Sequence, residues 1–404
     1  MKKRLIFKVL ALFIVITIIG CSVSSKKLTD QEILVKLFET MNGPKWKDSQ
    51  KDNWLSEKPI GEWKGVETNE EGRVVKLVLN ADSVTELVPK EIGELSELEE
   101  LSIFINNDGI TNNIPAEIGN LTKLKRLYLN LSLFIPYEER PLLPDVSSLV
   151  NLEYLFMSGF RGTIPNNIGQ LSKLKKLSLQ GLEGKIPESI CQLSELEELV
   201  LNTNKQPEGE VPQCIGKLTK LKKLHIDYST GFAGSLKQPD AKFPESIWDL
   251  PNLEYLFLRT VSNTGEFIPG DKVAKMRKLR GVAIIDCGLT GTIPIELFTS
   301  GELRSLDIYR NSITGTIPTE IGNCTQLSSI KLHQNALTGT IPAEIGNCDK
   351  LTILLLNGNQ LTGNIPKELA KCEKLIMFDL SNNQLSSNVP VALKAHPKFS
   401  NFKF

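Results

Sequence analysis

Most of the chain repeats one alternation of apolar and polar positions. From Val74 onward the pattern L-x-x-L-x-L occurs 13 times, usually followed by a segment of the form x-G-x-I-P. The prolines of these segments from Pro294 to Pro390 are 24 residues apart. Because side chains alternate between the two sides of a strand, L-x-L places its apolar residues on one face. One repeat cannot bury that face alone, so the pattern predicts 13 stacked strands around one shared core.

The repeat resembles the leucine-rich repeat, and its L-T-G-x-I-P-x-x-I-G form resembles the plant-type subclass. The resemblance implies an α/β solenoid: a horseshoe of about 13 repeats, with a parallel concave β-sheet and an irregular or 3-10 convex side. The asparagine that follows many strands is expected to bond neighbouring backbone. It stands at Asn106, Asn204, Asn311, Asn335, Asn359 and Asn383, whereas middle repeats carry Phe160, Leu182, Val261 and Cys287 there.

Both ends of the repeat array have the pattern of a cap. At the N-terminal end, Thr29-Asp-Gln-Glu32 is a capping box, and an apolar helix stripe over 33–41 follows it. Trp46, Trp54 and Trp63 come next, in an order that resembles the N-terminal caps of bacterial and plant leucine-rich repeat proteins. We predict a cap over 29–73, repeats over 74–393 and a C-terminal cap over 394–404.

The first 21 residues resemble the leader of a bacterial lipoprotein. Basic residues at positions 2–4 precede an apolar run over 9–19. That run is shorter than the roughly 20 residues of a transmembrane helix, so it indicates a signal peptide. The run leads into I-I-G-C, which resembles a lipobox ending at Cys21. The resemblance implies a signal peptide over 1–20, lipid on Cys21, a tether over 21–28 and anchoring in the bacterial outer membrane. Whether the protein faces the periplasm or the cell exterior stays open.

A block of several repeats also recurs along the sequence. Three segments recur in the same order: L-S-E-L-E-E-L, L-T-K-L-K-R/K-L and N-L-E-Y-L-F. They begin at Leu95, Leu121 and Asn151 and again at Leu193, Leu218 and Asn252. We infer that residues 95–192 were duplicated as residues 193–297. A long segment precedes each N-L-E-Y-L-F strand, over 133–143 and 230–243. These segments are either tolerated surface variation or paired binding loops on one rim.

Charges alternate across the predicted sheet. At the first outward position, strands two to nine carry Glu99, Lys125, Glu153, Lys175, Glu197, Lys222, Glu254 and Arg280. Opposite charges on neighbouring strands attract each other. The ladder is therefore first a structural feature, with contact to a ligand as the alternative.

Aromatic residues share the predicted concave face. They are Tyr128, Tyr154, Phe156, Tyr228, Tyr255, Phe257 and Tyr309. Aromatic patches on an exposed sheet are typical of protein or sugar contacts. We expect a ligand-binding surface there, and the alternative is that these rings only pack over one another.

The sequence predicts no catalytic residues, no metal site and no cofactor. It contains no CxxC, P-loop, HExxH or nucleophile elbow. His225 and His333 lie four predicted strands apart, about 19 Å, which is too far to share a metal ion. Cys324, Cys348 and Cys372 repeat every 24 residues at a core position and are expected to stay reduced. A bridge between Cys191 and Cys214 is left undecided.

These observations predict an envelope-anchored protein that recognises a protein ligand, from a host or from bacteria, without catalysis. The alternative is glycan binding or inhibition of a polysaccharide-degrading enzyme, as in some plant relatives. The chain has 47 basic and 47 acidic residues, which argues against a nucleic-acid partner. The expected partners are therefore a protein or a glycan and, through the lipid, a membrane. We expect a monomer.

Overall fold

The computed structural model describes residues 27–81, 84, 86–106, 113–131, 136–203, 211–228, 244–261 and 269–404. The predicted signal peptide, Cys21 and nearly all of the tether lie outside the described residues. So do Asn204, the predicted loop over 230–243 and residues 133–135 of the other loop.

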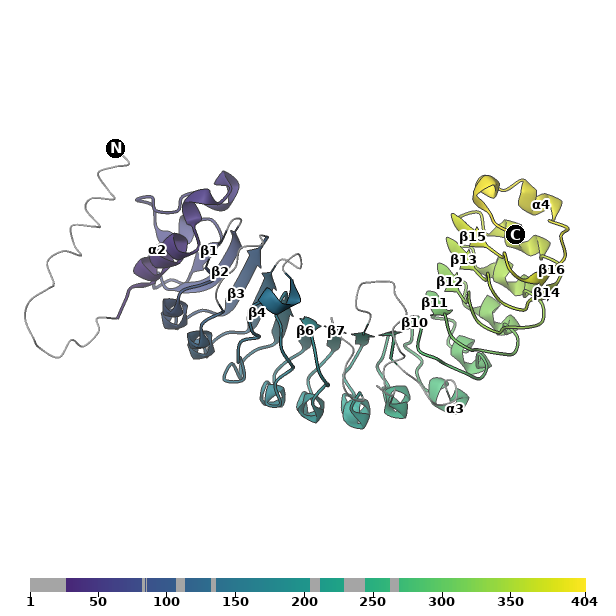
Figure 1. Ribbon diagram of the computed structural model, residues 1–404, viewed down its shortest axis with the longest axis horizontal. Coiled ribbons are helices and arrows are strands. Elements are labelled where there is room, and N and C mark those ends of the chain that lie inside the picture. The colour runs from purple at the N-terminus through teal and green to yellow at the C-terminus, as the bar shows by residue number, and fades with distance from the viewer. Residues whose placement is uncertain are drawn as a thin grey trace, which may run out of the picture.

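One sheet runs through the molecule, with its strands hydrogen-bonded in chain order from β1 to β13 and then β15. β1 and β2 are antiparallel, whereas the later pairs are parallel, with a shift of register near the end of the β6–β7 pair. Figure 1 shows an open arc with the strands on its inner side and short helical turns on its outer side. The strands are β1 (Val66–Thr68), β2 (Val74–Ala81), β3 (Glu100–Ile105), β4 (Arg126–Leu131), β5 (Tyr154–Ser158), β6 (Lys176–Leu182), β7 (Glu198–Thr203), β8 (Lys223–Asp227), β9 (Tyr255–Arg259), β10 (Gly281–Ile285), β11 (Ser305–Tyr309), β12 (Ser329–Lys331), β13 (Ile353–Leu355) and β15 (Met377–Asp379). The 13 predicted strands are β2 to β13 and β15, so the predicted solenoid is confirmed.

Short helices form the convex side, and most begin directly after a landmark proline. Pro115 shows how: the Ile118 amide donates to the Pro115 carbonyl and so starts the turn η5. The proline itself has no amide for the sheet, which ends the strand-side segment. The α-helices are α2 (Asp30–Thr40), α3 (Gly270–Val273) and α4 (Val391–Lys394). The convex 3-10 helices are η4 (Lys90–Glu94), η5 (Ala116–Asn120), η7 (Ile168–Gln170), η8 (Glu188–Gln192), η9 (Gln213–Lys217), η10 (Glu245–Asp249), η11 (Ile295–Phe298), η12 (Thr319–Asn323), η13 (Ala343–Asn347) and η14 (Lys367–Lys371).

Shorter elements complete the chain outside this regular pattern. Strands β14 (Thr362–Gly363) and β16 (Gln384–Leu385) form a separate two-stranded sheet. The remaining 3-10 turns are η1 (Gly43–Lys45), η2 (Asp48–Gln50), η3 (Ile60–Glu62), η6 (Tyr137–Glu139) and η15 (Phe399–Asn401). Within the described residues, no helix combines the length and the apolar character needed to cross a bilayer.

Asparagines join the regular C-terminal repeats as predicted. The Asn359 side-chain amide donates to the Leu332 carbonyl of the preceding strand at 2.9 Å, and its oxygen accepts from the Leu337 amide at 3.1 Å. The same two kinds of bond are made by Asn311, Asn335 and Asn383. In the middle repeats this position is filled by the buried apolar side chains of Phe160, Leu182, Val261 and Cys287. Those repeats therefore rely on packing where the C-terminal ones use hydrogen bonds.

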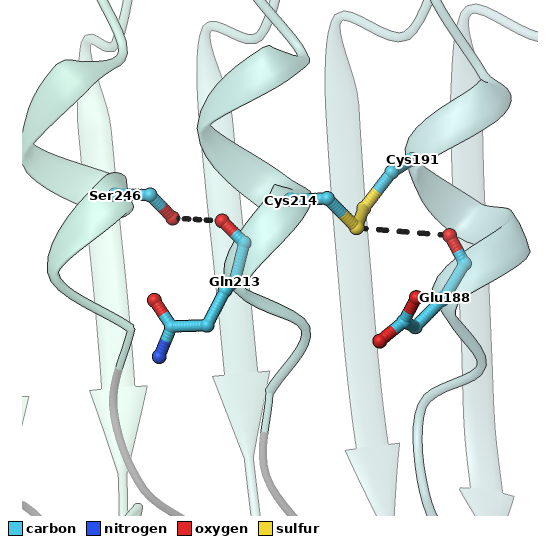
Figure 2. Close-up of a disulfide and its surroundings, with 5 residues drawn as sticks. All are labelled: Glu188, Cys191, Gln213, Cys214 and Ser246. Atoms are coloured by element: carbon cyan, nitrogen blue, oxygen red, sulfur yellow. Dashed lines mark hydrogen bonds between the residues drawn. A yellow bond between two sulfur atoms is a disulfide. The ribbon is translucent and has the colours of Figure 1, made fainter.

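The cysteines of the described residues divide into a buried reduced set and one disulfide. Cys324, Cys348 and Cys372 are fully buried and free, as predicted. Burial raises the pKa of Cys348 to about 12, which keeps its thiol protonated. Cys191 and Cys214 form a disulfide between η8 and η9 (Figure 2), and this settles the bridge that the sequence left undecided. The disulfide joins the end of the first duplicated block to the second block.

The residues before the repeats cover the N-terminal end of the core. Thr29 and Glu32 form the predicted capping box at the start of α2. The three tryptophans that follow α2 are at most 8% exposed, so they are core side chains. Asp30 accepts bonds from the Arg73 guanidinium and from the Val74 amide, which fixes α2 to the first parallel strand.

Candidate binding site on the concave face

Two rows of outward side chains cross strands β4, β5 and β6. The parallel register pairs Arg126 with Tyr154 and Tyr154 with Lys176 in the first row. Two residues further along each strand it pairs Tyr128 with Phe156 and Phe156 with Ser178 in the second row. Leucines between these positions point into the core, so the register alone brings the rows together.

In the first row Tyr154 stands between two cations. The guanidinium carbon of Arg126 lies 5.0 Å from the centre of the Tyr154 ring, and the Lys176 ammonium lies 5.9 Å from it. Each cation is also bonded to a carboxylate on its far side: Arg126 to Glu100 at 3.4 Å and Lys176 to Glu198 at 2.5 Å. The hydrogen bond that Lys176 donates to Glu198 raises the pKa of Lys176. The row is therefore electrically balanced around a fixed tyrosine.

In the second row Tyr128 and Phe156 stack, with ring centres 4.1 Å apart and planes only 5° from parallel. On β3 the residue in register is Ser102, and Phe104, two residues further along, packs on Tyr128 with ring centres 4.8 Å apart and planes tilted by 33°. The stack stops at β6, where the next residue in register is Ser178. Ser178 is too short to cover the second face of the Phe156 ring.

A hollow of about 350 Å³ lies over these two rows. Aromatic rings from β4 and β5 line it together with Ser178 on β6 and Val200 on β7, and the paired charges form its rim. Three of the seven predicted aromatic residues, Tyr128, Tyr154 and Phe156, thus meet in one place. Their part in binding a ligand stays a prediction.

Three other predicted residues lie on the same face but outside this hollow. Tyr255 is 41% exposed and leans over Gly281, where an added Cβ would lie 2.9 Å from the tyrosine ring. Phe257 stacks on His225 with ring centres 4.1 Å apart. Tyr309 stacks on His333 with ring centres 4.2 Å apart. The predicted surface is therefore a series of separate aromatic groups along the arc.

The predicted exposure of Tyr228 is wrong. Its side chain is only 2% exposed, and burial raises the pKa of its hydroxyl. The alternation that points Leu224 and Ile226 inward continues to position 228, directly after β8. The corresponding residue of the first duplicated block is the buried Leu131, which was the available sign that this position faces the core.

The charged rim of the hollow was missed in the sequence. The residue after each member of the charge ladder gives a second row, and five of these residues read Glu100, Arg126, Tyr154, Lys176 and Glu198. This symmetry about Tyr154 was visible once the strand register was assigned. No sequence pattern pointed to Ser178 and Val200. They help to form the hollow because their side chains are small and leave space.

The predicted charge ladder forms four ion pairs between neighbouring strands. Lys125 bonds Glu99 at 2.7 Å, Lys175 bonds Glu153 and Lys222 bonds Glu197 at 2.8 Å each, and Arg280 bonds Glu254 at 3.1 Å. Hydrogen bonds from the lysines lower the pKa of Glu153 and of Glu197. These carboxylates are thus held ionised. In the part of the chain that the structure describes, no three potential metal ligands lie together.

Comparisons with known proteins agree with this architecture. Residues 137–238 match the model of a leucine-rich repeat region, and residues 301–361 match a leucine rich repeat. No curated protein matches the chain by sequence.

Several solved structures share the fold. The plant peptide hormone receptor RGFR1, in complex with RGF2, is 28% identical with a TM-score of 0.65; the match covers 85% of this chain and 60% of the receptor chain. A leucine-rich repeat protein of Leptospira interrogans is 29% identical with a TM-score of 0.55, covering 77% of this chain and 79% of its own. The Arabidopsis receptor kinase HAESA, in complex with the peptide hormone IDA and the co-receptor SERK1, is 24% identical with a TM-score of 0.64 over 91% of this chain and 68% of its own, and it supports the fold alone. The protein is a leucine-rich repeat solenoid with structural neighbours among plant receptors.

Proposed function

We propose that the protein is an envelope-anchored binding protein that recognises a protein ligand on its concave face and has no catalytic activity. The observation that carries this proposal is the hollow around Tyr154. Binding sites are typically concave and mostly apolar, with a few polar groups that fix orientation. The hollow has this composition, on a scaffold that offers a long curved surface.

The charges around the hollow favour binding over catalysis. A general acid or base works best with a pKa near the working pH. Here the Lys176 ammonium is bonded to Glu198, which raises its pKa further above neutrality. The neighbouring Glu153 has a lowered pKa. Both groups are stabilised in their ordinary charged forms and are poorly suited to proton transfer.

Two observations favour a protein ligand over a glycan. The structural neighbour RGFR1 was solved with RGF2, and we extend peptide recognition from it to this chain as part of the proposal. Stacking on a sugar requires an open aromatic face. Tyr128 carries a ring on either side, and Tyr154 has a cation near its ring on either side. Neither tyrosine is an open platform for a sugar, and the one open face, on Phe156, is equally suited to an aromatic side chain.

Anchoring through Cys21 is the second part of the proposal. The Cys191–Cys214 disulfide supports export, because disulfides persist mainly outside the reducing cytosol. We expect the wild-type protein to sediment with membranes and the Cys21→Ala variant to appear in the soluble fraction. An unchanged membrane fraction for the variant would contradict the anchoring.

Binding is tested by purifying partners from host and bacterial extracts on the immobilised protein and then measuring affinity with each isolated partner. We expect Tyr154→Ala to weaken the complex at least tenfold, since it removes one wall of the hollow. Tyr255→Ala is the matched control, because it truncates the equivalent tyrosine of the second block, and we expect less than a threefold change. Equal affinities for the wild type and Y154A would place the site elsewhere.

A further inference from the structure

We infer that the hollow receives an aromatic side chain of the ligand, which stacks on the second face of Phe156 above Ser178. This inference rests on the proposed function, since it assumes a peptide or protein ligand on the concave face. It adds the chemistry of the group that enters the hollow.

The aromatic stack has one vacant position. Tyr128 and Phe156 occupy the same outward position on the consecutive strands β4 and β5. On β3 this position is Ser102, and Phe104, two residues further along that strand, packs on Tyr128. On β6 this position is Ser178, and on β7 it is Val200. The face of Phe156 that turns away from Tyr128 therefore looks across Ser178 toward Val200, and all three residues line the hollow.

The width of the vacancy fits one flat ring. Strands β5 and β7 are two strand spacings apart, about 10 Å. A ring placed midway stands about 5 Å from Phe156, close to the 4.1 Å between the stacked ring centres of Tyr128 and Phe156. A planar side chain would thus continue the stack at its own repeat distance and cover Val200 with its other face.

The surrounding charges fit an uncharged ring. Arg126 and Lys176 are both bonded to carboxylates, so the rim demands no charge from the ligand. An aliphatic side chain would cover the vacancy without gaining the stacking on Phe156.

The experiment selects a library of random 12-residue peptides, displayed on phage, on the purified protein, and screens an oligosaccharide array in parallel. Peptides that bind are synthesised and their affinities measured for three proteins. The first is the wild type. The second is Ser178→Phe, which fills the vacancy from within. The third is Ala283→Phe, a matched control that makes the same change beside Phe257 in the second block. Circular dichroism and thermal unfolding confirm that each variant folds.

We expect the selected peptides to share an aromatic residue, and replacing it by leucine to weaken binding about tenfold or more. S178F should lose binding to a similar extent, while A283F should stay within threefold of the wild type. Peptides that bind S178F as tightly as the wild type, or that tolerate leucine at every aromatic position, would overturn this inference and leave the proposed function standing. Glycan binding without any peptide binding would overturn both.

Discussion

The two similar blocks, residues 95–192 and 193–297, share the same arrangement of strands. They differ in the side chains that point outward from the sheet. Strands β5 and β9 both begin with the sequence Y-L-F, each directly after a glutamate. In each block the phenylalanine stacks at 4.1 Å on the ring of the preceding strand, Tyr128 in the first block and His225 in the second. The difference lies beside the tyrosines. Tyr154 is flanked by Arg126 and Lys176, whereas Tyr255 is flanked by Lys223 and Gly281.

The lack of a side chain at Gly281 changes the position of the neighbouring Tyr255 ring. Without a side chain at this position, the ring of Tyr255 settles onto the strand, within 2.9 Å of where a Cβ would be. In the first block Lys176 occupies the equivalent position and borders the hollow beside Tyr154. The same tyrosine therefore covers the sheet in one block and forms a wall in the other. The two blocks share a framework, and their outward residues set what lies beside each tyrosine.

The largest loss of stability is expected from a change at Tyr228, the buried tyrosine of the second block. Tyr228 fills the inward position that Leu131 fills in the first block, so Tyr228→Ala should leave a cavity and cost about 3–5 kcal/mol. Tyr228→Leu copies the first block and should cost clearly less. Urea unfolding followed by circular dichroism measures both. A cost below about 1 kcal/mol for Y228A, less than any cavity of this kind gives, would show that the two blocks do not use this position alike.

Removing the disulfide that joins the two blocks should cause the next largest loss of stability. The Cys191–Cys214 disulfide spans 23 residues, and closing a loop of that length stabilises a fold by roughly 3 kcal/mol. We expect the Cys191→Ser/Cys214→Ser variant to unfold at correspondingly lower urea concentration. Reductant should lower the wild type to the same midpoint and leave the double variant unchanged. A reductant effect on the double variant would mean that the disulfide is not the cause.

The fold was predictable from the sequence, whereas the hollow was predictable only in part. Buried leucines recur with so regular a spacing that strand number and order followed from it. The short antiparallel strand β1 was missed because three residues carry too little pattern. The prediction for Tyr228 is wrong because this residue, directly after β8, continues the inward alternation of Leu224 and Ile226. The hollow itself depends on the short side chain of Ser178 and on the lean of each tyrosine, which are set by neighbours on other strands.

Exchanging charges in the ladder tests whether its pairs act alike in the two blocks. Lys175→Glu removes the bond to Glu153 and should lower the unfolding temperature slightly, more at low salt than at high salt. Glu153→Lys/Lys175→Glu restores a pair of opposite charges and should recover most of the loss. The same exchange in the second block, Glu197→Lys/Lys222→Glu, should behave equally, because both native pairs are 2.8 Å long. Failure of both exchanges would show that the ladder acts as one continuous row.

The smallest expected effect is a loss of stability at acidic pH. It distinguishes the His225–Phe257 pair of the second block from the Tyr128–Phe156 pair of the first. Burial lowers the pKa of His225 below its ordinary 6.5, and Lys223 lowers it slightly, while Asp227 opposes them. Above pH 6.5 the histidine is neutral in the folded and unfolded chains, and the stack keeps its full stability. As the pH falls below 6.5, the unfolded chain binds a proton first, so stability declines until the pH passes the folded-state pKa.

The first block carries Tyr128 at the position that His225 holds in the second block. Replacing the histidine by the residue of the first block, His225→Tyr, should therefore reduce the loss of stability between about pH 7 and pH 5. Unfolding temperatures of the wild type and H225Y across this range measure the difference. His333, whose pKa burial also lowers, is present in both proteins and cancels. If H225Y declines as steeply as the wild type, the second stack is not sensitive to acid, and the two blocks differ in their exposed tyrosines but not in their stacks.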